Sequence, residues 1–200
     1  MIGTMRKLLF LTVMAICCLQ ASAQDDVYGN ASGKEIKTTG DVTGPLNEEG
    51  NYEEKRVVDV EGATAGVLFG RAMEALSDMV GADGNVKAGI DYSDKDAGTI
   101  VYKGNSLIGY ASVIGDKIPF YMDFTLKIRC KDGRAQVTIT VAGAHAIAKS
   151  LGVQHYKMED LEKVVLRRPK RFKIFPIPDA ANALFVTIEE KLKKTEDDDF

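Results

Sequence analysis

The sequence contains no tryptophan, three cysteines and two histidines among its 200 residues. Cys17 and Cys18 lie near the start of the chain, which leaves Cys130 as the one thiol beyond the first segment. Zinc and redox motifs need several such ligands at short spacing, and neither HExxH nor CxxC occurs. His145 and His155 also share no predicted helix or strand face. The sequence therefore predicts no metal site and no cofactor.

The chain begins with a pattern typical of a secretory signal peptide. Two basic residues precede an apolar run from Leu8 to Leu19, and the small residues ASA follow it. The run has about a dozen residues, whereas a membrane-spanning helix needs roughly 20. We therefore expect residues 1–23 to be cleaved, with Gln24 as the new N-terminus in the periplasm or outside the cell.

Lipid attachment to Cys17 or Cys18 is the alternative for this segment. Ile16 is bulky where a small residue usually precedes a lipidated cysteine, and Ala15 stands where leucine usually precedes Cys18. Both positions favour cleavage over a lipoprotein anchor.

Net charge limits the possible partners of the mature chain. Loss of Arg6 and Lys7 with the first 23 residues lowers the basic count from 26 to 24, while all 29 acids remain. The formal net charge thus changes from −3 to −5. Nucleic-acid affinity rests largely on a basic face, and an exported protein meets little nucleic acid, so we exclude this partner. A single remaining cysteine also excludes an intramolecular disulfide.

Composition divides the mature chain into three parts. Residues 24–52 are rich in glycine, asparagine, threonine and acids without apolar periodicity, which predicts a flexible linker. Residues 53–194 carry the patterns of one folded domain. Residues 195–200 form an acidic tail.

The predicted elements of the domain follow from periodicity and turn residues. Thr64 can cap the first helix and Asp179 the last one. We expect a strand over residues 55–62, a helix up to about residue 80, a hairpin over 86–105, two strands within 119–143 and a helix over 179–194. Residues 106–117 contain several glycine or serine breaks and are expected to form a loop or an irregular edge strand.

The clearest pattern is PFYMDFTLKIRCKDGRAQVTITVAG, residues 119–143. Apolar residues alternate with polar ones on both sides of the turn KDG, which gives the predicted sheet one apolar and one polar face. The polar positions include Lys127, Arg129, Arg134 and Gln136. A sheet of this kind needs a single layer of helices over its apolar face. We predict an α+β fold with a curved antiparallel sheet, two helices on one face and the order β-α-β-β-β-β-α.

The segment DFTLKIRCKDGRAQVTIT, with GTIVYKG upstream and an opening strand that ends in VEG, resembles domain-of-unknown-function family 4468. This resemblance implies a TBP-like fold and secretion by a member of the Bacteroidetes. It implies no activity and no catalytic residues. Ala135 after KDGR, where the family often has an aromatic residue, departs from the pattern.

We assign no catalytic residue from the sequence. Cys130 is expected to face the core, where a thiol is inert. The best candidate for a binding site is the basic stretch RRPKRFKIFPIP, residues 167–178, which follows Lys163 and is expected to lie against the domain through its aromatic residues. Its candidate binding residues are Arg167, Arg168, Lys170, Arg171 and Lys173.

Arginine forks suit anionic groups. We therefore expect a non-enzymatic envelope domain that binds a protein or an anionic envelope component. Two other classes stay open. One is a hydrolase, whose mark would be a closed pocket with a buried carboxylate or histidine. The other is a structural module that associates with itself through its sheet edges. The composition of these segments does not decide between the three, nor does it set the oligomeric state.

Overall fold

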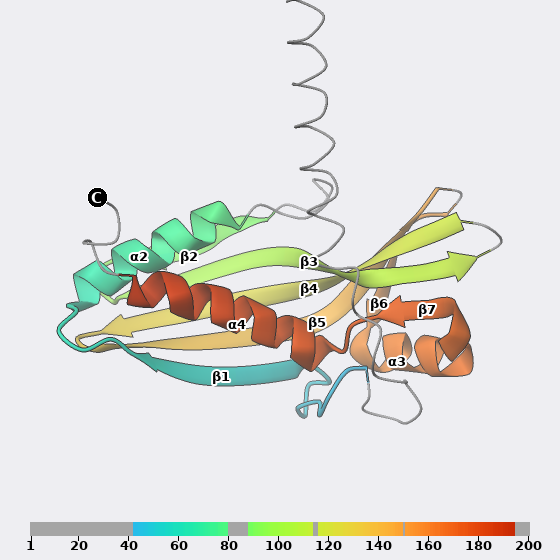
Figure 1. Ribbon diagram of the computed structural model, residues 1–200, viewed down its shortest axis with the longest axis horizontal. Coiled ribbons are helices and arrows are strands. Elements are labelled where there is room, and N and C mark those ends of the chain that lie inside the picture. The colour runs from blue at the N-terminus through green and yellow to red at the C-terminus, as the bar shows by residue number, and fades with distance from the viewer. Residues whose placement is uncertain (1–41, 80–87, 114–115, 150, 195–200) are drawn as a thin grey trace, which may run out of the picture. The chain divides into compact units, whose positions relative to one another are not determined.

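The computed structural model describes residues 42–79, 88–113, 116–149 and 151–194, all of which belong to the second of two compact units, Ile36–Phe200. Figure 1 shows these elements along the chain. In order they are β1 (Tyr52–Asp59), α2 (Ala65–Asp78), β2 (Gly89–Asp94), β3 (Thr99–Val113), β4 (Asp116–Lys131), β5 (Arg134–Ala148), β6 (Gly152–Lys157), α3 (Met158–Arg167), the 3-10 helix η1 (Pro169–Arg171), β7 (Phe172–Ile174) and α4 (Ile177–Lys193).

The strands form one antiparallel sheet in which β3, β4 and β5 are the long central members. Its main order is β1-β5-β4-β3-β2. The second half of β5 pairs with β6, and the far end of β3 pairs with β7. The predicted α+β class, with a curved antiparallel sheet and helices on one face, is confirmed. The structure adds β6, α3 and β7 to the predicted order.

The alternation in β4 and β5 places the core on one face of the sheet. Every apolar position of the alternating pattern is buried. These positions are Phe120, Met122, Phe124, Leu126, Ile128 and Cys130 in β4 and Ala135, Val137, Ile139 and Val141 in β5. The register pairs Leu126 with Ile139 and Ile128 with Val137, so the two apolar rows lie side by side. This result confirms the two-faced sheet that the sequence predicts.

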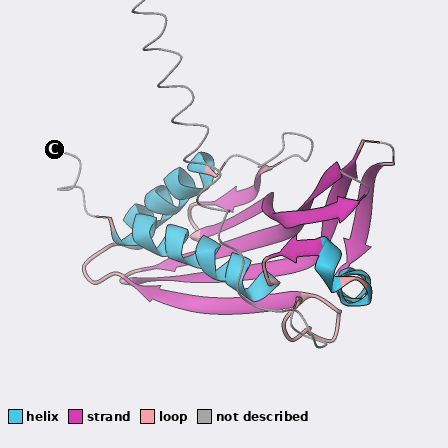
Figure 2. Ribbon diagram, turned by 45° about the vertical axis from the view of Figure 1, so that its right-hand side comes forward, coloured by secondary structure: helices cyan, strands magenta, loops and turns pink. Residues whose placement is uncertain are grey.

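Three helices cover the apolar face (Figure 2). Helices α2 and α4 lie side by side, and the Arg71 guanidinium donates to the carbonyl oxygen of Leu192 at 3.0 Å. Buried side chains of α3, namely Met158, Leu161 and Val165, join the same core. The predicted number of two helices was too small, because the amphipathic segment before the basic stretch is long enough to form α3.

Of the two N-cap residues predicted from the sequence, Thr64 and Asp179, the structure confirms the first and not the second. The Thr64 hydroxyl accepts from the backbone N–H of Val67 at 3.3 Å, which confirms the predicted N-cap. Asp179 does not cap α4. This helix begins at Ile177, two residues earlier, so Asp179 lies in its first turn, where a carboxylate still favours the positive end of the helix dipole.

β1 and α4 come from opposite ends of the described chain and meet over the core. The Arg56 guanidinium lies 4.3 Å from the centre of the Phe185 ring. Arg56 is also paired with Glu54 of the same strand, whose carboxylate accepts from the Tyr52 hydroxyl at 2.6 Å. Burial acts to raise the pKa of Glu54, but these two hydrogen bonds outweigh it and hold the pKa below its usual range.

Of the two expectations for residues 106–117, a loop or an irregular edge strand, the loop is wrong for residues 106–113. This stretch is a strand with a register shift between Leu107 and Gly109, and β7 pairs with it on the other side at residues 109–111. β3 continues to Val113 and pairs with β4 along its whole length. Gly104 and Gly109, which break the periodicity, are positions of close approach. A Cβ on Gly104 would lie 2.7 Å from the Tyr102 ring and 3.0 Å from the Phe124 ring.

The last residues of the predicted linker belong to the folded domain. Val42 is fully buried, and its carbonyl oxygen accepts from the backbone N–H of Ile177 at 2.7 Å. Thr43 is buried as well, with its hydroxyl 3.4 Å from the carboxylate of Glu162 in α3. The structure therefore moves the start of the domain from residue 53 to residue 42 at the latest. The signal peptide, the rest of the linker and the acidic tail lie outside the described residues.

Candidate functional site: an arginine pocket between α3 and β7

The basic stretch begins at the end of α3, turns through η1 and enters the sheet as β7. Phe172 pairs with Ala111 of β3, and its ring packs edge-on against the Phe120 ring with 5.6 Å between ring centres. Ile174, two residues further on, is buried in the core. The expected attachment of the stretch through its apolar side chains is therefore observed for Phe172 and Ile174.

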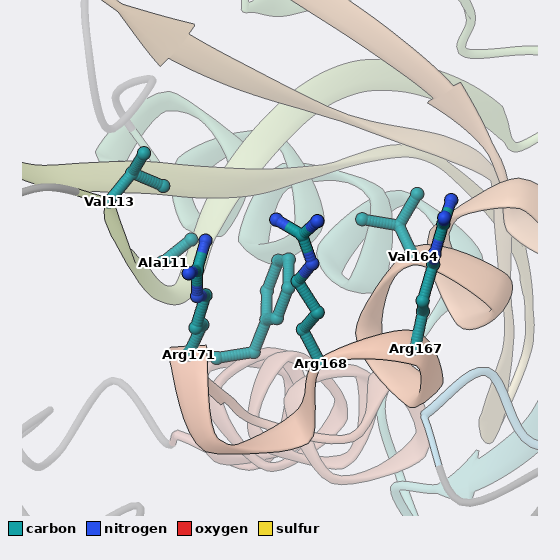
Figure 3. A pocket seen from close by; sticks show the side chains of 7 residues that line it. Ala111, Val113, Val164, Arg167, Arg168 and Arg171 are labelled. Atoms are coloured by element: carbon teal, nitrogen blue, oxygen red, sulfur yellow. The ribbon is translucent and has the colours of Figure 1, made fainter.

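A pocket of about 290 Å³ opens where this turn faces the end of β3. Figure 3 shows three arginine side chains that rise next to one another from the turn and from the last residue of α3. The lining consists of Ala111, Val113, Val164, Arg167, Arg168, Arg171 and Phe172. Nearly all of the lining surface is apolar, so the three arginines contribute to the pocket chiefly through the aliphatic parts of their side chains.

The three guanidiniums have no acidic partner within the described part of the chain. In α3, Glu159 and Asp160 lie in the first turn, at the opposite end of the helix and within 3.6 Å of Lys163. The third acid of this helix, Glu162, is buried, with its carboxylate 3.4 Å from the Thr43 hydroxyl. Lys163, which the sequence placed next to the basic stretch, is therefore engaged in α3. Three cations close together and without counter-charges create a local potential that attracts anions.

The structure brings three of the five candidate binding residues together. Arg167, Arg168 and Arg171 line the pocket, whereas Lys170 and Lys173 are exposed and outside its lining. The difference arises because η1 and β7 send successive side chains in different directions. The sequence showed the cluster of charge but not this division.

A second polar cluster, which sequence reasoning missed, lies on the sheet face opposite the helices. His145 is fully buried, and its Nδ1 lies 2.8 Å from the Asp123 carboxylate. The Tyr121 ring stacks on His145 with 5.1 Å between ring centres. His155 of β6 is directly opposite His145 in the register, with 5.8 Å between ring centres.

The expectation that His145 and His155 share no helix or strand face is wrong. His145 and His155 do share a sheet face, because a tight turn with Gly152 at φ 68° folds β6 back onto β5. The described residues contain no group of three or more His, Cys, Asp or Glu side chains that could hold a metal ion. The arginine pocket is not lined by any residue of this cluster.

Cys130 faces the core, as the sequence predicts, and is 4% exposed. Its burial raises the pKa of the thiol to about 11. Nucleophilic cysteines have lowered pKa values, so this side chain is a packing residue.

Comparison with known proteins defines the class of fold. The family model described as "Domain of unknown function (DUF4468) with TBP-like fold" matches residues 55–142. The fold is thus TBP-like, and the resemblance to this family is supported over those residues. The arginine pocket draws most of its lining from beyond them.

Two solved structures are similar to this chain. A DUF4468 family protein from Bacteroides ovatus ATCC 8483 is 16% identical, with a TM-score of 0.56 over 79% of this chain and 96% of its own. A TBP-like protein from Parabacteroides distasonis ATCC 8503 is also 16% identical, with a TM-score of 0.52 over 76% of this chain and 98% of its own. A search of curated proteins found no match. None of the described helices has the length and hydropathy needed to cross a membrane.

Proposed function

We propose that this protein is an exported, non-enzymatic domain that binds an anionic amphiphile of the cell envelope in its arginine pocket. The observation that carries the proposal is the combination of three guanidiniums, free of acidic partners within the described residues, with an apolar lining. A carboxylate or phosphate accepts paired hydrogen bonds from a guanidinium fork, which favours arginine for such ligands.

The apolar part of the pocket determines the rest of the ligand. Ala111, Val164 and Phe172 offer no hydrogen-bonding side chain, so the group that covers them is apolar. Val113 and Val164 are each 36% exposed and extend the apolar surface beyond the pocket. A volume of about 290 Å³ suits an anionic head and the first carbons of a chain. A headgroup-bearing lipid therefore fits better than a small inorganic anion.

The test is retention on vesicles of phosphatidylcholine with or without phosphatidylglycerol, at low salt. One variant combines Arg167→Ser, Arg168→Ser and Arg171→Ser. The control variant combines Lys170→Ser and Lys173→Ser. We expect the arginine variant to lose retention on the anionic vesicles, at an unchanged melting temperature, and the lysine control to keep most of it. Equal retention of both variants would refute the pocket as the binding site.

A soluble probe distinguishes a lipid headgroup from a free anion. Decyl phosphate and inorganic phosphate are titrated against the full chain and followed by the chemical shifts of Ala111 and Phe172. We expect saturable shifts with decyl phosphate alone. Shifts of equal size with inorganic phosphate would show that the apolar lining takes no part in binding.

Export is the second element of the proposal, and it rests on the pattern in residues 1–23. Mass spectrometry of the protein recovered from cell fractions should show Gln24 as its first residue. An intact N-terminus, or a lipid mass on Cys17 or Cys18, would contradict cleavage after Ala23.

Hydrolysis remains the second candidate function, because of one observation. A buried histidine that is hydrogen-bonded to a carboxylate, as His145 is to Asp123, is the arrangement of a general base and its orienting group. Activity on a panel of chromogenic esters and glycosides that is lost in Asp123→Asn would support it. Self-association through sheet edges, the third candidate, predicts a mass in solution that rises with protein concentration.

A further inference from the structure

We propose that the sheet face opposite the helices binds an anionic polysaccharide through a second basic site. The site consists of Lys55 in β1 and of Lys127 and Arg129 in β4, and we call it the outer-face cluster. It is separate from the arginine pocket, which lies at the other end of β3 on the side of the helices.

The register of the strands places the cluster on one face. Lys55 pairs with Thr138 of β5, and Thr138 pairs with Lys127 of β4. Their side chains therefore share a row across three strands, with about 4.8 Å between neighbours. Arg129 is two residues beyond Lys127 on the same strand, about 7 Å away on the same face. Its neighbour in β5 is Gln136.

Charge on this face is positive at the centre and negative at the edges. No ion pair joins Lys55, Lys127 or Arg129 to an acid within the described part of the chain. Acids of the face lie on both edge strands, with Glu53 and Asp59 on β1 and with Asp91 and Asp94 on β2. Asp91 is paired with Lys103 at 2.9 Å, and Asp94 accepts from the Tyr92 hydroxyl. Asp123, on β4, lies 2.8 Å from His145. Lys127 and Arg129 on the central strand β4, with Lys55 across β5 from Lys127, thus remain available to an anionic partner.

The open form of this sheet surface selects a polymer. Side chains on a pleated sheet stand roughly perpendicular to it and enclose no volume, so each cation alone holds a small anion weakly in water. An extended chain with repeated negative charges contacts all three cations at once, and the contacts reinforce one another.

The groups between the cations select a polysaccharide. Gln136, Thr138 and Thr140 are half-buried on this face and present amide and hydroxyl groups that can hydrogen-bond to sugar hydroxyls. Single-stranded nucleic acid would need aromatic side chains at successive positions for base stacking. This part of the face offers only Tyr92, at the edge of the sheet.

The experiment is affinity electrophoresis of the full chain through gels that contain polygalacturonate, dextran sulfate or neutral dextran. The variant Lys55→Gln/Lys127→Gln/Arg129→Gln is compared with Lys149→Gln/Lys163→Gln/Lys170→Gln, which removes the same number of charges from other exposed positions. We expect the outer-face variant to bind at least tenfold more weakly and the control to bind as the parent does. A preference for one of the two anionic polymers identifies the carboxylate or the sulfate as the recognised group.

Further outcomes separate this proposal from general attraction between charges. Gln136→Ala/Thr138→Ala keeps every charge and should weaken polysaccharide binding several-fold. Equal loss in both lysine-containing triple variants, or tighter binding of an oligothymidylate than of either polysaccharide, would overturn the proposal. The serine variant of the arginine pocket should bind the polysaccharides normally, so the two proposed sites fail or succeed independently.

Discussion

The backbone of Gly109 in β3 lies directly against the backbone of Lys173 in β7. Gly109 has φ 138°, and a Cβ there would overlap the carbonyl oxygen of Lys173 and approach the Cα of Ile174. Because these neighbours are backbone atoms, neither can rotate away. This contact sets how closely β7, and with it the turn that carries the arginines, approaches the sheet.

Gly109→Ala should therefore destabilise the protein and disturb the arginine pocket. We expect a loss of about 2–4 kcal/mol in the free energy of unfolding, from the overlap and the strained φ together. Denaturant titration measures this loss, and chemical shifts of Ala111 and Phe172 report on the pocket. Gly62→Ala is the control, because Gly62 has φ 78° with no atom within 4 Å of the added Cβ and should cost only about 1–2 kcal/mol. Equal costs at both positions would contradict the role of the contact.

Cys130 should make the stability fall at alkaline pH. Its pKa is raised by burial to about 11 from an ordinary value of 9.0, so the folded state disfavours the thiolate. The contribution of the neutral thiol is complete below pH 9 and is lost as the pH rises towards 11, by about 2–3 kcal/mol. Urea midpoints from pH 8 to 10 should fall more steeply for the parent than for Cys130→Ala. Parallel curves would show that Cys130 does not titrate differently in the two states.

The carboxylate of Glu54 should stabilise the protein at neutral pH and lose this effect in acid. Hydrogen bonds from Tyr52 and Arg56 hold its pKa low against the effect of burial, so its contribution is present above the ordinary pKa and disappears as the pH falls through the lowered value. Glu54→Gln should cost about 1 kcal/mol at pH 7 and almost nothing near pH 3. Thermal melts at both pH values measure this. Glu53→Gln changes an exposed position of the same strand and should leave the melting temperature unchanged at both pH values.

The two histidines should differ in their effect on stability. His145 is fully buried between Tyr121, Asp123 and His155, whereas His155 is exposed. Replacement of a buried, hydrogen-bonded ring leaves a cavity and removes the hydrogen bond to Asp123, so His145→Ala should cost about 2–4 kcal/mol. His155→Ala should cost less than about 1 kcal/mol. Chemical denaturation of both variants tests this difference, and the reverse order would contradict the observed burial.

The central strands could be predicted from the sequence because apolar residues, which are buried, alternate in them with polar residues, which face the other side of the sheet. The same rule did not decide between a loop and an irregular edge strand in β3 after residue 105. Gly104 and Gly109 break an apolar pattern, but they do so because the Tyr102 ring and β7 occupy the space of their missing side chains. A glycine that ends a strand and a glycine that allows close packing look alike in sequence. Only the partner strand distinguishes them.

The candidate site was predictable in its location but not in its composition. A run of five cations marks a surface of positive potential, whereas the pocket depends on the turn at η1, which separates the three arginines from Lys170 and Lys173. The contact between His145 and His155 could not be predicted either. It depends on the hairpin between β5 and β6, whose short and polar second strand carries little apolar pattern.

The contact of Arg56 with Phe185 has a consequence for the timing of folding. The first strand of the sheet and the last described helix complete the same core, so the part of the apolar face beneath α4 stays uncovered until this helix has been synthesised. A growing chain on the ribosome can form hairpins, α2 and α3, but it cannot bury the part of the face that α4 covers. Closure of the core therefore waits for α4, and a chain that is released before this helix is made lacks the element that would close it.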